Sequence, residues 1–159
     1  MTAVRYLGAF AFATGLLGVS AGSTPPVPRA VRAMVYRTGE SRSTRVILQL
    51  RIESTGLVLG SYSGGFHFDP ALLVVDSAEA GRDGSRFVNA QRAAQGDIRF
   101  AGFSTTGFAG TDAVRLVAHL TKAIDPIPLD VVLDVAGDLE GRPVTRNSLR
   151  GTRRTTSAR

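Results

Sequence analysis

The residues of this chain whose types could do chemistry are two histidines, a glycine-framed serine segment and a few carboxylates. His67 and His119 each stand between apolar neighbours, so in an extended strand both imidazoles would face away from the core. Histidines on a sheet surface are typically solvated, and we expect neither to be catalytic. The segment Gly60–Gly64 has the glycine frame of a nucleophile elbow, but tyrosine stands at its centre and no helix pattern follows. Nucleophilic serine chemistry is therefore not indicated.

Three evenly spaced aspartates, Asp130, Asp134 and Asp138, suggest either glycosidase carboxylates or a calcium edge. On one face of an extended strand, Asp130 and Asp134 would lie about 13 Å apart, beyond the ~5–9.5 Å that separates glycosidase carboxylates. Calcium loops also place their ligands closer together in sequence. We therefore interpret the three as charges that keep a strand soluble at a sheet edge. We expect no catalytic residue, no metal and no cofactor.

Composition removes several other kinds of site. The 159 residues, one domain's length, include no cysteine and no tryptophan, with 8 Phe and 3 Tyr. Disulfides, thiolate metal sites and a cysteine nucleophile are excluded. A broad aromatic platform for sugars or bases would be thinly supplied. The glycines around residues 64 and 107–110 lack the lysine or helix that follows a phosphate-binding loop.

The formal net charge of +6 is confined to the C-terminal end. Residues 142–159 hold 6 of the 19 basic residues and no acid, so residues 1–141 balance 13 basic against 13 acidic side chains. Because large apolar residues are scarce in this segment, it predicts a disordered basic tail. Two roles stay open for it, binding to an anionic surface or a linker without a partner. We expect no nucleic-acid binding by the folded body.

Residues 1–21 have the pattern of a secretory signal peptide. Arg5 is followed by an uncharged apolar run that ends in a small-residue Val-Ser-Ala cleavage sequence. The run has about 16 residues, fewer than the roughly 20 that span a bilayer, although retention as an uncleaved anchor is the alternative. After cleavage we expect an extracytoplasmic protein without a membrane span, in which residues 22–29 form a proline-rich extended leader.

From residue 30 to residue 141 the apolar residues recur with period two, which predicts β-strands. Glycine, aspartate and proline separate the runs. The expected strands are 33–37, 46–52, 60–68, 72–76, 87–90, 98–103, 114–120 and 129–135. Short strands at such regular intervals predict one all-β domain, an antiparallel β-sandwich of about nine strands.

The same period predicts which side chains face the core. In the second strand the inward residues would be Val46, Leu48, Leu50 and Ile52. In the last strand they would be Leu129, Val131, Leu133 and Val135, with Asp130 and Asp134 outside.

The segment Gly65–Val75 resembles the strand–turn–strand signature of cohesin modules, in which an aromatic-Asp-Pro turn joins two strands. Further parts of that signature follow in order. They are a turn glycine at Ala80-Gly81, a strand carrying an asparagine at 87–89, a Gly-x-Ile-x-hydrophobic-Ala strand at 96–101 and a glycine turn with a long amphipathic strand at 110–122. The resemblance covers residues 30–138 and implies a flattened jelly-roll sandwich. It also implies a non-catalytic role, because cohesins hold dockerin modules of secreted polysaccharide-degrading enzymes onto a scaffold.

The resemblance further indicates a partner-binding sheet face. Outward residues that resemble positions on the face cohesins use are His67, Asn89, Arg99, Arg115 and His119. We therefore predict a secreted, monomeric, non-catalytic module that binds a dockerin-bearing protein or a polysaccharide.

Two alternatives stay open. One is a small extracytoplasmic glycan-active enzyme, with Asp69 or Asp134 as its candidate carboxylates. The other is a surface-associated protein held to an anionic envelope by its arginine-rich tail.

Overall fold

The computed structural model describes residues 29–38, 44–82, 85–108, 111–144 and 149–154. The predicted signal peptide 1–21 lies outside these residues, as does the predicted leader 22–29 apart from Arg29. The strands are β1 (Ala30–Thr38), β2 (Arg45–Thr55), β3 (Leu59–Phe68), β4 (Leu73–Ala80), β5 (Ser85–Asn89), β6 (Asp97–Phe108), β7 (Thr111–Leu120), β8 (Leu129–Asp138) and β9 (Leu149–Arg154). A 3-10 turn, Ala93–Gln95, precedes β6.

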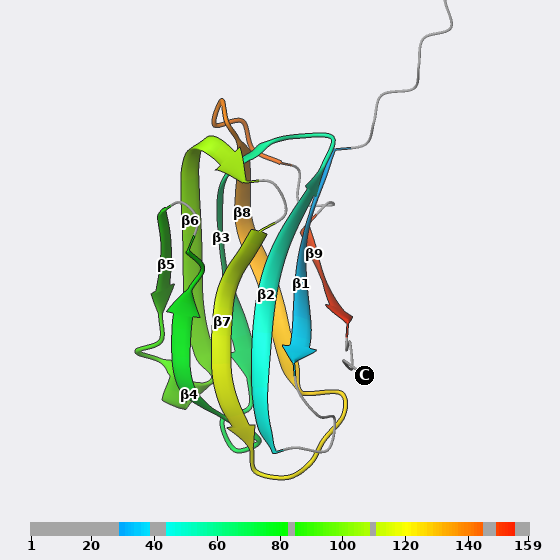
Figure 1. Ribbon diagram of the computed structural model, residues 1–159, viewed down its shortest axis with the longest axis vertical. Coiled ribbons are helices and arrows are strands. Elements are labelled where there is room, and N and C mark those ends of the chain that lie inside the picture. The colour runs from blue at the N-terminus through cyan, green and yellow to red at the C-terminus, as the bar shows by residue number, and fades with distance from the viewer. Residues whose placement is uncertain (1–28, 39–43, 83–84, 109–110, 145–148, 155–159) are drawn as a thin grey trace, which may run out of the picture.

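These strands form two sheets packed face to face (Figure 1). One sheet has the order β4-β7-β2-β1-β9 and the other has the order β5-β6-β3-β8. Several consecutive strands, such as β6 and β7, belong to different sheets, so the chain crosses repeatedly from one layer to the other. The predicted all-β sandwich is confirmed, and residues 30–141 supply eight strands close to the expected positions.

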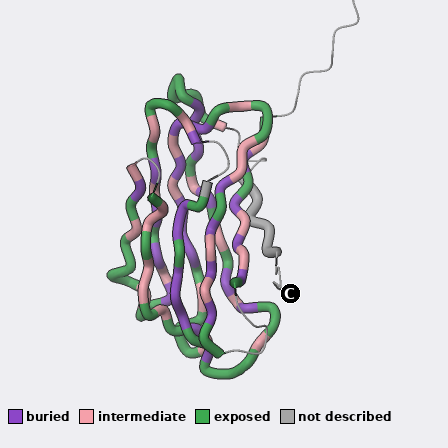
Figure 2. Tube along the Cα trace, viewed as in Figure 1, coloured by how far each residue is buried: buried purple, intermediate pink, exposed green. Residues whose placement is uncertain are grey.

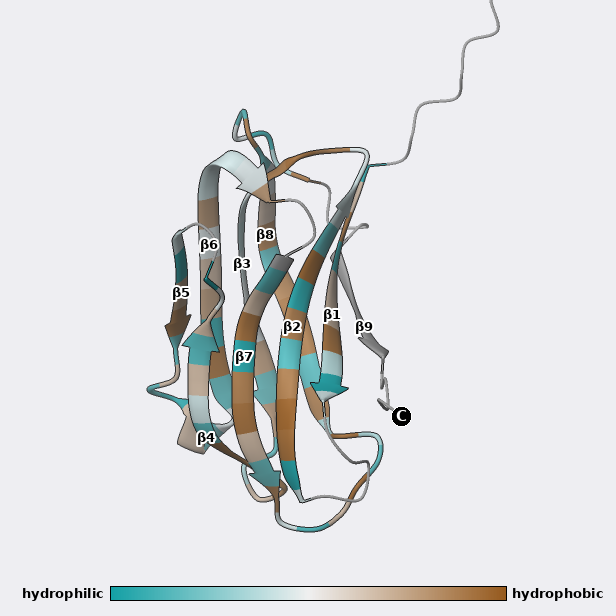
Figure 3. Ribbon diagram, in the orientation of Figure 1, coloured by the Kyte–Doolittle hydropathy of each residue, from teal (hydrophilic) through white to brown (hydrophobic). Residues whose placement is uncertain are grey.

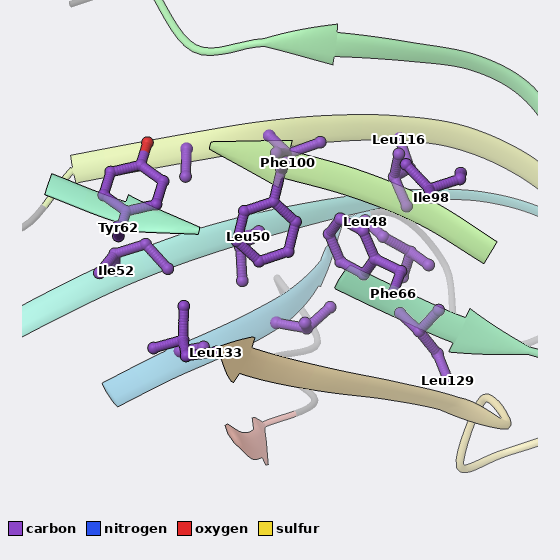
Figure 4. Packing of buried hydrophobic residues seen from close by; sticks show 14 of the residues in the cluster. Leu48, Leu50, Ile52, Tyr62, Phe66, Ile98, Phe100, Leu116, Leu129 and Leu133 are labelled. Carbon is purple, nitrogen blue, oxygen red and sulfur yellow. The ribbon is translucent and has the colours of Figure 1, made fainter. Parts of the chain in front are cut away.

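The core lies between the two sheets and follows the predicted alternation (Figure 2). Along β2 the side chains of Val46, Leu48, Leu50 and Ile52 are buried, and polar residues separate them. Figure 3 shows the matching alternation of hydrophobic and hydrophilic positions along β2 and β7. Leu48, Leu50 and Ile52 of β2 lie between the sheets with residues of β3, β6, β7 and β8 (Figure 4). Burial of this apolar area is the main stabilising contribution to the fold.

Aromatic rings fill one part of the core. Tyr62 contacts Phe108 edge-on at 5.2 Å between ring centroids, and Phe66 contacts Phe100 at 5.3 Å. The guanidinium carbon of Arg86 lies 5.1 Å from the centroid of the Phe108 ring. Burial raises the pKa of the Tyr62 hydroxyl, and the neighbouring Arg86 cation partly offsets that rise. Tyr62 is therefore a packing residue that stays protonated at neutral pH.

Residues 142–159 do not all lie outside the fold, contrary to the predicted disordered tail. Leu149–Arg154 form β9, which pairs in parallel with β1 from Val31↔Leu149 to Tyr36↔Arg154. Before β9, the amide of Val144 donates to the carbonyl of Ala136 at 2.8 Å. The prediction from composition was wrong for residues 149–154, because backbone pairing along the open edge of β1 does not require apolar side chains. The β1–β9 pair is parallel, whereas the other described pairs of strands are antiparallel as expected.

A bulge in β8 overturns two expectations about the last strand of the body. Ser63 of β3 pairs with Val135 and Gly64 pairs with Leu133, which leaves Asp134 as an extra residue. Beyond such a bulge the inside and outside positions exchange. Val135 is consequently 57% exposed rather than in the core. Asp138 is 4% exposed, so the three evenly spaced aspartates do not share one face.

Candidate binding face

The structure divides the five predicted site residues between two outer surfaces. His67, Asn89 and Arg99 are exposed residues of β3, β5 and β6, neighbouring strands of one sheet. Arg115 and His119 are also exposed, but both belong to β7 in the other sheet. The expectation of one shared face therefore does not hold. Period two determines whether a side chain points outward, but not to which sheet its strand belongs.

The outer face of the β5-β6-β3-β8 sheet, hereafter the β3 face, is organised in rows by the strand register. Its outward positions in successive rows are Ser85, Phe103, Ser61 and Gly137; Phe87, Ala101, Ser63 and Val135; Asn89, Arg99, Gly65 and Val132; and Asp97, His67 and Asp130. In the first three rows the β3 residues are small, namely Ser61, Ser63 and Gly65. The larger side chains of these rows stand on the other three strands.

Four of the seven exposed large hydrophobic residues in the described part of the chain lie on the β3 face. Phe87 is 59% exposed and Phe103 is 52% exposed. The two rings stack with centroids 6.2 Å apart and an interplanar angle of 18°. Val132 and Val135 stand on β8, at the opposite edge of the sheet. Clustered exposed apolar side chains on a small domain are typical of an interaction surface.

An ion pair crosses the middle of the β3 face. Arg99 of β6 bonds to Asp134, the bulge residue of β8, so its side chain passes over β3. A β-carbon at Gly65 would lie only 2.8 Å from Nη1 of Arg99, so glycine at this position leaves the path open. Gly65, the β8 bulge and Arg99 together position this bridge.

The end of the β3 face beyond this bridge is charged. His67 pairs in register with Asp97 on one side and with Asp130 on the other. Its Nδ1 lies 3.4 Å from Oδ1 of Asp97, and Arg92 approaches the second Asp97 oxygen at 3.8 Å. Asn89 plays a local role, since its side-chain oxygen accepts the Gln91 amide proton at 3.0 Å.

The outer face of the β4-β7-β2-β1 strands differs in character. Its charged side chains form ion pairs, with His119 Nδ1 2.9 Å from Asp76 and Arg115 Nη1 3.4 Å from Glu79. Among β4, β7, β2 and β1, as far as their side chains are described, Val74 of β4 is the one large hydrophobic residue that is exposed, at 39%. Arg115 and His119 are thus engaged within a charged surface that offers little apolar contact area.

The candidate carboxylates are used structurally. Asp69 accepts the Ala71 amide proton through its side chain at 2.8 Å, which stabilises the turn between β3 and β4. Asp134 bonds to Arg99. No group of three or more His, Cys, Asp or Glu side chains among the described residues is arranged to hold a metal ion.

Asp138 is a buried anchor at the end of β8. Its carboxylate accepts hydrogen bonds from Arg29 Nη2 at 2.9 Å, from Arg142 Nε at 2.8 Å and from the Arg142 and Glu140 amides. Burial by itself would raise the pKa of Asp138, but these bonds from Arg142 and Arg29 lower it to about 2. Asp138 therefore fastens the segment after β8 to the sandwich and is not a proton donor.

Sequence reasoning missed the apolar residues of the β3 face. Phe87 and Phe103 are in phase with Asn89 and Arg99, so the period already placed both rings outside. That phase was the signal available for finding them. Val135 gave no such signal, because the bulge that exposes it arises from strand pairing.

Several proteins of known structure have an architecture similar to that of this chain. The structure is similar to a seventh ScaB type I cohesin from Pseudobacteroides cellulosolvens, with TM-score 0.55 and 10% identity over 81% of this chain and 92% of that one. It is equally similar to a non-cellulosomal cohesin from Archaeoglobus fulgidus, with TM-score 0.54 and 13% identity over 80% and 92% of the two chains.

The chain has a cohesin-like fold. A third similar structure is a type I cohesin–dockerin complex from Clostridium thermocellum, with TM-score 0.56 and 12% identity over 80% of this chain and 99% of that one. At the level of sequence, neither a family model nor a curated protein matches. The predicted cohesin resemblance is therefore confirmed for the fold of this cohesin-like chain.

Proposed function

We propose that this chain is a secreted, non-catalytic module that binds a dockerin-type protein partner through the β3 face. The observation that carries the proposal is the gathering of exposed Phe87, Phe103, Val132 and Val135 on this one face. Exposed aromatic residues supply much of the binding energy in protein interfaces.

The contrast between the two outer faces supports the choice of surface. On the β4-β7-β2-β1 side, charged side chains pair with one another, as in Arg115–Glu79 and His119–Asp76. The β3 face also has ion pairs, Arg99–Asp134 and His67–Asp97, but it adds four large exposed apolar side chains to them. Desolvating apolar groups favours association, whereas desolvating exposed ion pairs gives little net gain.

Structural neighbours support the class of partner. Two similar structures are cohesins in complex with dockerins, one from Clostridium thermocellum and one from the scaffoldin B of Acetivibrio cellulolyticus. This chain shares only its fold with those cohesins, so a dockerin-type partner is a proposal for it. The stacked Phe87–Phe103 pair is also compatible with a polysaccharide surface, which the experiment below includes as a competing ligand.

Secretion is part of the proposal and rests on the pattern of residues 1–21. No helix among the described residues is long and apolar enough to cross a membrane. N-terminal sequencing of the protein exported from a bacterial host should find a mature chain that begins at Gly22. Recovery of a membrane-bound chain with an intact N-terminus would instead support the uncleaved anchor.

The function is tested by calorimetric titration of the full mature chain with a panel of purified dockerin modules. Pull-down on insoluble cellulose, xylan and chitin runs in parallel. We expect one or more dockerins to bind, and Phe103→Ser to weaken that binding at least about tenfold. The matched control is Val74→Ser, an exposed apolar residue of the other sheet, which should leave the affinity unchanged.

Three outcomes would contradict the proposal. They are the absence of binding to every dockerin of the panel, binding to a glycan that Phe103→Ser abolishes, and equal loss of dockerin binding in the Phe103 and Val74 variants. Circular dichroism and thermal unfolding of each variant confirm that the fold is retained.

A further inference from the structure

The charge on the β4-β7-β2-β1-β9 sheet changes sign from one edge of the sheet to the other. The edge strand β4 contains the exposed carboxylates of Asp76 and Glu79 and no basic residue. At the opposite edge, β1 and β9 contain arginines and no acid. Figure 1 shows β4 and β9 at the two sides of this sheet. An anionic ligand would therefore be attracted to the β1–β9 edge and repelled from β4.

The strand register gathers arginines of β2, β1 and β9 in one region. Arg51 of β2 is a diagonal neighbour of Arg32 in the β1–β2 register. Across the next pair of strands, Arg150 is the register partner of Arg32, and Arg154 is that of Tyr36. Because register partners stand on the same side of a sheet, the positions of Arg51, Arg32, Arg150 and Arg154 share its outer face. This region, hereafter the arginine strip, extends about 10 Å across the strands and about 13 Å along them.

Acidic residues are too few to neutralise the arginine strip. Glu53 is the one acidic residue of β2, β1 and β9, and its carboxylate lies 3.9 Å from Nε of Arg51. Arg32 is exposed and forms no ion pair with the residues that the structure describes. The parallel pairing with β9 instead places a second arginine, Arg150, beside it. Like charges on neighbouring strands repel each other, so a bound anion would stabilise this edge of the sheet.

The arrangement favours a ligand with several anionic groups in a row. A guanidinium group can donate two parallel hydrogen bonds to one carboxylate, and its planar geometry also suits other oxyanions. The strip offers such groups on three adjacent strands. A linear polymer with repeated anionic groups would contact several of them at once, and the linked contacts strengthen one another.

The rest of this outer face argues against a nucleic acid and against a bilayer. Tyr36, which is half-buried, is the only phenylalanine or tyrosine in the five strands, whereas proteins that bind single strands stack bases on several aromatic rings. The exposed large hydrophobic residue of these strands, Val74, belongs to the acidic strand β4. A membrane-binding surface instead combines basic residues with an apolar face that enters the bilayer. An acidic polysaccharide needs neither feature.

We propose that the arginine strip binds an acidic polysaccharide, a linear glycan with repeated carboxylate or sulfate groups. Arg32 and Arg51 of the sandwich and the arginines of β9 form one site for it. The pairing of β9 with β1 builds this site, because it brings residues 150 and 154 next to Arg32. The strip lies on the sheet opposite the β3 face, so the proposal does not depend on a dockerin-type partner.

The first test measures binding of the mature chain to three immobilised glycans by biolayer interferometry. Polygalacturonate carries carboxylates, dextran sulfate carries sulfates, and dextran is the uncharged control. We expect at least one acidic polymer to bind at about 50 mM salt and to bind at least about tenfold more weakly at about 0.5 M salt, because salt screens the attraction. The polymer that binds identifies the anionic group. Binding to neither acidic polymer would overturn the proposal.

Substitutions locate the binding on the chain. Arg32→Gln should weaken binding to the acidic polymer about threefold or more, and Arg32→Gln with Arg150→Gln should weaken it more than about tenfold. The matched controls are Arg82→Gln and the pair Arg82→Gln with Lys122→Gln, which remove the same charge at exposed residues after β4 and β7. These controls should change the affinity less than about twofold. Equal losses in the two sets would show a response to overall charge and would overturn the site.

A truncated chain separates the sheet from the residues that follow it. A chain that ends at Arg154 keeps β9 and loses residues 155–159, which include one arginine. It should retain the affinity of the mature chain within about threefold. Loss of binding in this chain, with no effect of Arg32→Gln, would assign the binding to residues 155–159 and overturn the proposal.

The second test measures the repulsion that the ligand relieves. At low salt, Arg32→Gln should raise the midpoint of thermal unfolding by about 1–4 °C, because it removes a like-charge contact. The acidic polymer should raise the midpoint of the wild-type chain and leave that of the Arg32→Gln, Arg150→Gln chain unchanged. A variant that lost binding by misfolding would unfold at a lower temperature. A lower midpoint for Arg32→Gln would therefore contradict the proposal.

Competing ligands complete the test. Tighter binding to a single-stranded or duplex oligonucleotide, or to phosphatidylglycerol vesicles, than to both acidic glycans would overturn the assignment to a polysaccharide. Phe103→Ser should leave glycan binding unchanged, and Arg32→Gln should leave dockerin binding unchanged. Loss of glycan binding in Phe103→Ser would place the glycan on the β3 face and overturn the arginine strip.

Discussion

Asp138 joins the start of β1 to the end of β8 and to the segment that follows β8. Its carboxylate at the end of β8 bonds to Arg29, which precedes β1, and to Arg142, which follows β8. The side chain of Asp138 is 3% exposed, whereas those of Arg29 and Arg142 are more than half exposed. The position of this carboxylate was visible in the sequence, but its burial and partners were not, because they depend on the bulge at Asp134.

Stability should depend on pH through Asp138. Its pKa is about 2 in the folded chain and about 3.9 when unfolded. The lower folded value means that its stabilising contribution is complete above about pH 5 and is lost as pH falls through about 2. Asp138→Asn should lower the urea midpoint at pH 7 and flatten the fall in stability between pH 5 and pH 2. Asp112→Asn, at an exposed carboxylate, is the control and should leave the slope unchanged.

Two adjacent glycines should differ in their tolerance of alanine. A β-carbon at Gly65 would meet the flexible end of Arg99 on the outer face, whereas one at Gly64 would overlap the Val132 carbonyl and lie 2.7 Å from the Phe100 ring. Gly65→Ala should cost at most about 1 kcal/mol, the value of an exposed ion pair. Gly64→Ala should cost about 1–3 kcal/mol, as overpacking does. Urea unfolding of the two variants measures the difference, and equal costs would contradict it.

At the scale of elements, β8 determines which residues the sheet presents. Before its bulge the inward residues have odd numbers, as at Leu129 and Leu133, and after it they have even numbers, as at Ala136. The bulge therefore moves Val135 onto the β3 face and aims Asp134 at Arg99. Sequence periodicity found the strand but assigned its second half to the wrong faces.

Because of the bulge, we expect substitutions at Leu133 and Val135 to change the unfolding free energy by different amounts. Leu133→Ala removes a buried side chain and should lower the unfolding free energy by about 2–5 kcal/mol. Val135→Thr changes an exposed side chain and should stay within about 0.5 kcal/mol of the wild type. Chemical denaturation checks both values. A large cost at both Leu133 and Val135 would favour the uninterrupted alternation that the sequence predicted.

β9 makes the C-terminal segment part of the domain. A chain ending at Gly141 loses the β1–β9 pairing, the bond from Val144 to Ala136 and the bonds between Arg142 and Asp138. Because each backbone hydrogen bond contributes roughly 0.5–1.5 kcal/mol, we expect such a truncation to lower the unfolding free energy by about 2–4 kcal/mol. Hydrogen exchange of β1 amides should also accelerate. The control chain ends at Arg154 and retains β9. Unchanged stability in both truncated chains would support the disordered tail that the composition predicted.

At the scale of the whole molecule, the two outer surfaces of the sandwich differ in their exposed apolar residues, although both carry ion pairs. Four exposed hydrophobic residues lie on the β3 face, whereas ion pairs occupy the β4-β7-β2-β1 side. The excess charge of +6 comes from residues 142–159, of which residues 149–154 form the edge strand β9. The choice of the β3 face as the binding surface therefore rests on the distribution of apolar side chains.

The oligomeric state tests whether the β3 face binds a different protein or a second copy of this chain. We expect the mature chain to be a monomer at micromolar concentration, because two copies joined through the β3 face would have to desolvate its ion pairs Arg99–Asp134 and His67–Asp97. Sedimentation equilibrium measures the mass. A dimer that Phe103→Ser dissociates and Val74→Ser does not would assign this face to self-association.

The amino-acid sequence alone determined the strands, the buried side of most of them and the cohesin resemblance, because side-chain alternation and turn residues are local properties. Only the tertiary structure decided which strands are neighbours, where β8 bulges and that residues 149–154 join the sheet. Those features arise from hydrogen bonding between strands far apart in the chain. The β3 face depends on them, since Phe87, Phe103 and Val135 become one surface only when β5, β6, β3 and β8 pair.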